Sequence, residues 1–183
     1  MARLPYVDPA TAPAPVRELL EGLPVRLNIF RMVAHAERNA RPLLRLGTSI
    51  LTEQQLSATL RELAILRVAR LSGAEYEWTQ HVPIAKAVGV SDAQVDALAR
   101  DDAGASCFDP VARLVLRFTT EVVERVGVPD ALFAEMQRHF SAREIVELVL
   151  AIGFYMTMAR LMEVTRIDVD EAAGARLVGA ISK

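Results

Sequence analysis

Helix-start signals stand before several apolar stretches of this sequence, and no stretch alternates between apolar and polar residues as a half-buried strand does. Ser91-Asp92-Ala93-Gln94 and Ser141-Ala142-Arg143-Glu144 have the capping-box pattern, in which Gln or Glu follows Ser by three residues. Asp109-Pro110 combines an N-cap residue with proline at the first helical position. Apolar residues follow each signal at helical spacing. The pattern predicts an all-α protein.

The length of the chain, 183 residues, fits a single domain spanning residues 1–183. Residues 1–15 contain four prolines and cannot form one helix, so we expect an extended Pro-rich N-terminal arm. Separate helices are expected over 28–39 and 42–51. Thr52-Glu53-Gln54-Gln55 is a further capping-box pattern, and Ser57 is the alternative start of the helix that follows.

Composition limits the partners of the protein. Its hydrophobic content of 52% is high for a helical domain, which favours a homo-oligomer. The net charge of −2 and the lack of a basic run give no support for binding nucleic acid or an anionic membrane. The most apolar run, Leu148 to Ala159, is too short to span a bilayer and indicates a core helix. With no signal peptide at the N-terminus, the expected location is cytoplasmic.

A polar cluster, Glu75-Tyr76-Glu77-Trp78-Thr79-Gln80-His81, heads one predicted helix and is the best candidate site. Glu77 and His81 are four residues apart and therefore share a helix face. A carboxylate beside an imidazole makes a general acid or base that works near neutral pH. Tyr76 and Trp78 can wall a substrate pocket. Two ligands are too few for a metal site, so none is predicted.

Glu62 is the second unusual residue, because it lies in a helix that is apolar on nearly every face. Such a helix is buried, and a buried Glu needs a partner or stays protonated. If the chain folds back at Ser72-Gly73, then Arg67 and His81 are the candidate partners. The alternative is that these groups form only a structural ion-pair network in a non-catalytic helical module.

The stretch from Arg61-Glu62-Leu63 to Glu77-Trp78-Thr79-Gln80-His81 resembles the signature of the carboxymuconolactone decarboxylase family, part of the alkylhydroperoxidase D-like superfamily. The resemblance covers roughly residues 25–168. It implies a compact helical bundle of about six main helices, a homo-oligomer such as a trimer or hexamer, and no cofactor.

Two chemistries occur in the family that the sequence resembles. Peroxidase members carry a Cys-x-x-Cys pair, whose positions are Ala74 and Glu77 here, so both thiols are missing. The single Cys107 leaves peroxide reduction or redox sensing as an alternative. Decarboxylase members need no thiol. By that resemblance we expect a cofactor-free carbon–carbon lyase acting on a small carboxylated lactone or related cyclic acid.

The resemblance also suggests roles for the residues singled out above. His81, Glu77 and Glu62 are the candidate catalytic residues, with His81 as the proton donor and a glutamate orienting it. Arg67 is the candidate for holding the substrate carboxylate, and Tyr76 and Trp78 for shaping the pocket.

Overall fold

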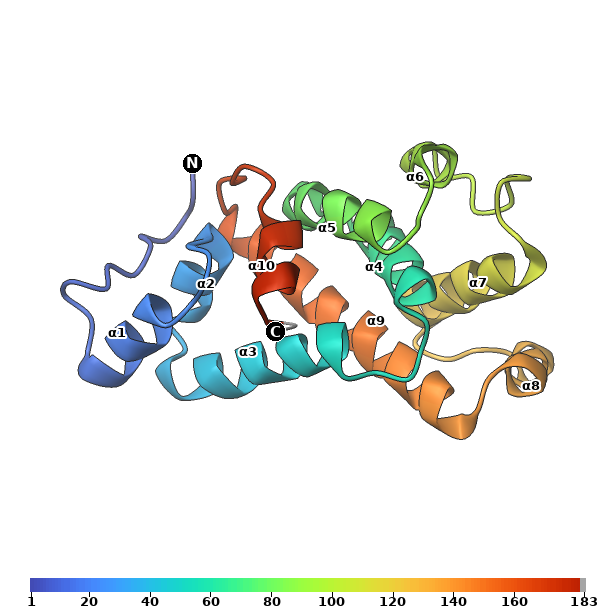
Figure 1. The fold of residues 1–183 in the computed structure, drawn as a ribbon, viewed down its shortest axis with the longest axis horizontal. Coiled ribbons are helices and arrows are strands. Elements are labelled where there is room, and N and C mark those ends of the chain that lie inside the picture. The colour runs from blue at the N-terminus through green and yellow to red at the C-terminus, as the bar shows by residue number, and fades with distance from the viewer. Residues whose placement is uncertain (182–183) are drawn as a thin grey trace.

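The computed structural model describes residues 1–181, and within that range it contains ten helices and no strand (Figure 1). The all-α prediction is therefore confirmed. Six of the helices have ten residues or more. The helices are α1 (Ala14–Glu21), α2 (Asn28–Val33), α3 (Glu37–Thr52), α4 (Ala58–Ser72), α5 (Glu75–Ala87), α6 (Asp92–Ala99), α7 (Pro110–Arg125), α8 (Asp130–His139), α9 (Ala142–Thr165) and α10 (Gly174–Ile181).

The centre of the molecule is the pair α4 and α9. Helix α4 packs against α5, α7 and α9, and nine consecutive residues, from Arg61 to Ala69, are buried. No face of α4 is left for solvent over this stretch, as its near-continuous apolar sequence predicts. The consequence for function is that Glu62 is held at the core and has to be satisfied from inside the protein.

Local capping explains several helix boundaries. The boxes at Ser91 and Ser141 form with both reciprocal hydrogen bonds, and the Asp109 side chain accepts from the Ala112 amide. Gly73 ends α4 in the left-handed conformation, with φ of 63°, which glycine adopts without a Cβ penalty. This turn directs α5 back along α4 and places the polar cluster beside Glu62.

Two expected boundaries in the N-terminal half are wrong. The box at Thr52 does not form, because Thr52 is the last residue of α3 and its hydroxyl donates to the Thr48 carbonyl; Ser57 precedes α4 instead. The expected break before Pro42 lies earlier, after α2, and Pro42 is inside α3. A proline there removes one backbone donor. The N-terminal arm, expected over residues 1–15, is two residues shorter, because helix α1 already begins at Ala14.

The N-terminal arm lies against the end of α9 and the segment that follows it. The Arg3 amide donates to the Thr165 carbonyl, and the Tyr6 hydroxyl donates to the Asp168 carboxylate at 2.9 Å. After Asp168 the chain turns back, and α10 lies between α3 and α5, in front of α9 (Figure 1). The C-terminal segment thus covers the head of α5, where the polar cluster lies.

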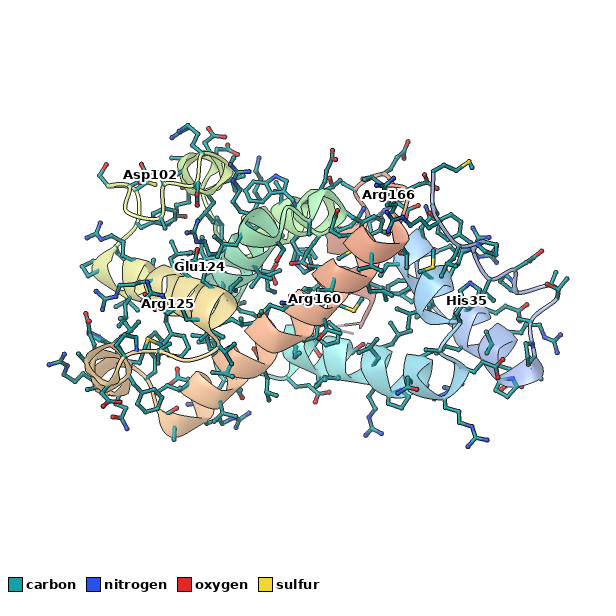
Figure 2. All side chains as sticks on the ribbon, turned by 180° about the vertical axis from the view of Figure 1, so that it is seen from behind. His35, Asp102, Glu124, Arg125, Arg160 and Arg166 are labelled. Carbon is teal, nitrogen blue, oxygen red and sulfur yellow. The ribbon has the colours of Figure 1, made fainter. Side chains whose placement is uncertain are left out.

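Helix α9 is the one described helix with the length and apolar composition to cross a membrane, and 44% of its most apolar window is buried in the protein. The core helix of a soluble protein meets the same criteria. The buried side of α9 faces α4, whereas its outer side carries Val146, Val149 and Leu150, all exposed. Figure 2 shows this outer side crossing the back of the molecule, with Arg160 on it.

Candidate active site

A mostly apolar cavity of about 130 Å³ lies between α2, α3, α5, α9 and α10. Its polar wall is one face of α5, formed by residues at spacings of one, three and four. The residues of α5 that line it are Tyr76, Glu77, Gln80, His81 and Ile84. Residues of α3, α9 and α10, including Gly47, Phe154, Tyr155 and Leu177, complete the walls. Helical periodicity thus collects the conspicuous polar residues of α5 on the cavity side.

His81 is held in the cavity wall by Glu62, as the fold-back at Ser72-Gly73 predicts. Its Nδ1 lies 2.8 Å from Glu62 Oε2, and Glu62 is completely buried. A carboxylate accepts only, so this contact assigns the proton to Nδ1. The other nitrogen, Nε2, has no hydrogen-bond partner among the described residues. It is therefore free to exchange a proton with a ligand in the cavity.

Arg61 supplies the charge that balances Glu62. Its Nε lies 3.4 Å from Glu62 Oε1, and the Arg61 residue is only 3% exposed. A buried carboxylate needs a close opposite charge to offset its lost hydration, and Arg61 supplies that charge. The sequence prediction missed Arg61 as a partner because residues one apart do not normally face each other on a helix.

Glu77 has a different environment from Glu62. It is 2% exposed, it lines the cavity, and neither carboxyl oxygen has a hydrogen-bond partner within residues 1–181. Burial raises the pKa of Glu77 well above its usual value, and the nearby Glu62 charge raises it further. Burial therefore favours the neutral, protonated form of the Glu77 carboxyl group, which can donate a hydrogen bond into the cavity.

Tyr155 is a cavity residue that the sequence reasoning did not select. Its ring meets the His81 ring edge-on, with centroids 4.7 Å apart. Burial raises the pKa of the Tyr155 hydroxyl well above 10, with further contributions from Glu62 and Glu77. The hydroxyl stays protonated, so it is a second neutral donor near His81. Its signal in the sequence was only a tyrosine in an apolar run, which more often indicates core packing.

Tyr76 and Gln80 bind the C-terminal segment. The Tyr76 hydroxyl donates to Asp170 Oδ2 at 2.5 Å, and the same oxygen accepts from the Asn28 amide at 2.6 Å. Gln80 accepts from the amides of Ala173 and Gly174 at 2.9 and 3.1 Å. Tyr76 lines the cavity as expected, but its hydroxyl is already engaged. These contacts dock α10 over the cavity.

Arg67 and Trp78 do not line the cavity. Arg67 donates to Thr120 Oγ1 at 2.9 Å and forms a salt bridge with Asp101, on the α7 side of α4. It follows Glu62 by five residues, which is about 140° around a helix, so the two side chains diverge. Trp78 is half-buried and packs with the apolar cluster that includes Leu63 and Leu66. The structure thus separates both residues from the site proposed for them.

Cys107 also lies apart from the cavity. It lines a separate surface pocket with residues of α6, and its thiol donates weakly to the Ala93 carbonyl at 3.6 Å. Within the described part of the chain, no three His, Cys, Asp or Glu side chains are grouped closely enough to hold a metal ion. The ionisable side chains that line the cavity are Tyr76, Glu77, His81 and Tyr155, with the Tyr76 hydroxyl bound to Asp170, and Glu62 and Arg61 lie behind His81.

The comparison with known families agrees with this arrangement. The model of the carboxymuconolactone decarboxylase family matches residues 38–121, a stretch that includes Glu62, Glu77 and His81. Together with the fold of the solved structures described below, this match supports the carboxymuconolactone decarboxylase and AhpD-like superfamily for the chain. The family match ends within α7, so Tyr155 and α10, which complete the cavity, lie beyond it. No curated protein sequence matches the chain significantly.

Solved structures share the superfamily fold at low sequence identity. One is an uncharacterized peroxidase-related protein from Ralstonia eutropha JMP134, described as an alkylhydroperoxidase AhpD core. It superposes with a TM-score of 0.80 at 16% sequence identity, and the alignment covers 100% of the present chain and 97% of the Ralstonia chain. A peroxidase-related protein from Silicibacter sp. TM1040 gives 0.78 at 17%, covering 92% of both. The debrominase Bmp8, in complex with 2,3,4-tribromopyrrole, gives 0.75 at 17%, covering 99% and 100%. At these identities the likeness establishes the fold.

Proposed function

We propose that this protein is a cofactor-free acid–base enzyme that acts on a small cyclic substrate, as a carbon–carbon lyase of the decarboxylase type. The observation that carries the proposal is the buried, unpartnered Glu77 beside a His81 that Glu62 orients, both facing one apolar cavity. Two groups with different proton affinities in one site are the usual basis of acid–base catalysis.

His81 exchanges the proton with substrate carbon. Glu62 fixes the proton on Nδ1 and stabilises the imidazolium when Nε2 takes a second proton. In the proposed reaction the bond between ring carbon and carboxylate breaks, and carbon dioxide leaves. The electron pair moves into a conjugated carbonyl of the ring, and protonated His81 then delivers a proton to the carbon. One proton is consumed for each carbon dioxide released.

Glu77 and Tyr155 stabilise the charge that develops on the substrate oxygen. Burial raises the pKa of each group and so favours its protonated form, which can donate a hydrogen bond. Donors that are in place before the reaction stabilise an enolate more in an apolar cavity than in water. Arg67, which the sequence suggested for holding the carboxylate, is committed to Asp101 and Thr120 and has no part in this mechanism.

The debrominase Bmp8 supports the expected size of the substrate. It binds tribromopyrrole, a single substituted ring, on the same fold. A single ring also matches the volume of the cavity in the present chain, since an engineered apolar cavity of about 150 Å³ holds benzene.

The test is turnover of a panel of cyclic keto acids and lactone acids, measured as carbon dioxide release by purified full-length protein. His81→Ala is expected to abolish turnover while retaining the circular dichroism spectrum of the wild type. His139→Ala is the matched control, because His139 is exposed and far from the cavity lining. Full turnover in His81→Ala would refute the proposed role of His81.

Peroxide reduction through Cys107 is the second candidate, favoured by the peroxidase-related proteins that share the fold. A thiolate would attack the peroxide to give a sulfenic acid, which an added thiol then reduces. The separation of Cys107 from His81 and Glu62 leaves it without the acid–base pair. Thiol-dependent peroxide consumption that disappears in Cys107→Ser would establish this activity in place of the lyase.

A further inference from the structure

The cavity contains no basic side chain apart from His81 among the described residues that line it. The two buried arginines of α4 are already paired: Arg61 with Glu62, and Arg67 with Asp101. Arg26 and Arg31 line an outer pocket, which shares only Leu23, Leu27 and Phe30 with the cavity. A ligand in the cavity therefore meets one group that can become a cation, and neutral donors otherwise.

The groups that face Glu77 come from three helices. Glu62 and Arg61 lie on α4, His81 on α5, and Tyr155 on α9. The cavity residues contributed by α2, α3 and α10 carry no ionisable group. With Glu62 and Arg61 cancelling, the net charge around the ligand is set by Glu77 and His81 alone.

We propose that the cavity selects single-ring ligands that carry at most one negative charge, and that Glu77 is the residue that sets this limit. The inference rests on the proposed function, whose substrate it narrows to a cyclic monoacid. Glu77 donates its proton to the one anionic or carbonyl oxygen that enters, and His81 balances that charge as imidazolium. A second carboxylate finds no further cation, and only neutral donors such as the Tyr155 hydroxyl.

The energetic reason is desolvation. Each carboxylate that enters an apolar cavity loses its hydration, and a close partner is needed to compensate. Glu77 and His81 compensate one such loss. For a dianion of the same ring size, no cation compensates the second loss, and a penalty of that kind weakens binding by about 100-fold or more.

The test is a ligand series built on one ring: benzyl alcohol, benzoate and phthalate. Binding to the full-length protein is measured by calorimetry or ligand-observed NMR at pH 7 and constant ionic strength. Benzyl alcohol and benzoate are expected to bind, and phthalate to bind at least about 100-fold more weakly than benzoate. Phthalate binding within about threefold of benzoate overturns the proposal, as does failure of both of the other ligands to bind.

Two variants of similar size isolate Glu77. The quantity compared is the affinity for benzoate divided by the affinity for benzyl alcohol. Glu77→Gln keeps a hydrogen-bond donor, so this ratio should stay within about threefold of its wild-type value. Glu77→Leu removes the donor, and the same ratio should fall about tenfold or more. An unchanged ratio in Glu77→Leu refutes the role of Glu77. Because these are binding ratios, they can fail while the turnover of the wild type and its loss in His81→Ala still support the lyase.

Discussion

Replacing Glu77 by Gln removes a buried group that titrates and leaves one of nearly the same shape that does not. In the folded protein the pKa of Glu77 is well above the ordinary value of 4.5, because burial and the Glu62 charge both disfavour ionisation. The folded state therefore keeps a proton that the unfolded chain releases. As pH rises from 4.5 toward the folded pKa, this difference lowers the stability of the wild type but not of Glu77→Gln.

The size of the effect follows from proton linkage. A group ionised only in the unfolded state changes the free energy of unfolding by about 1.4 kcal/mol for each pH unit. In a chain of this size, 1 kcal/mol corresponds to about 2–4 °C in Tm. The Tm of Glu77→Gln minus that of the wild type should therefore grow by about 3–6 °C for each pH unit across this window.

Differential scanning fluorimetry between pH 5 and pH 8 measures this difference directly. Taking the difference at each pH cancels the titration of groups that Glu77 does not influence. Glu75→Gln is the matched control, since Glu75 lies on the same helix with its side chain exposed, and its difference should change little. A constant difference for Glu77→Gln over the whole range would show that Glu77 is not kept protonated by the fold.

Three further predictions follow from the structure. In Gly174→Ala the new Cβ would clash with the backbone carbonyl oxygen of Gln80, so α10 should detach and its amide hydrogen exchange should become about tenfold faster or more. Gly179→Ala is the control: its Cβ would have no neighbour within 4 Å, so the exchange rate should match that of the wild type. Arg67→Met should lower the free energy of unfolding by about 1–3 kcal/mol yet keep turnover; a folded but inactive variant would return Arg67 to the active site. Light scattering should find a homo-oligomer that Leu150→Lys, on the exposed side of α9, weakens; a monomeric wild type would contradict the expected self-association.

The helical fold could be predicted because its signals are local. The Ser91 and Ser141 caps and the Gly73 stop each depend on a few neighbouring residues, and all three form. The boundaries that were wrong, at Thr52 and Pro42, also have local signals, but α3 continues through Pro42 to Thr52 where it packs against α2, α9 and α10, so tertiary contacts override these signals.

The active site could be predicted only in part, because helix faces follow from spacing whereas their neighbours do not. Spacing of four places Glu77 and His81 together, and the turn at Gly73 brings Glu62 to His81. Trp78 follows Glu77 by one residue, about 100° around the helix, and so faces away. Tyr155 reaches the site from a helix more than 70 residues later, and no local pattern indicates that contact.

Position 77 decides what His81 can do. The peroxidase relatives that the sequence resembles carry a thiol there, and a histidine four residues later can take a proton from it to make a nucleophile. Here the position holds a carboxyl group that burial keeps protonated, with its pKa raised, and a neutral carboxylic acid is a poor nucleophile. The pairing of His81 with Glu62 is nevertheless intact, at 2.8 Å. A base that is oriented but has no thiol of its own to activate is available for a proton of the substrate or of a water molecule. This argues against thiol chemistry in the cavity and supports the proposed proton transfer.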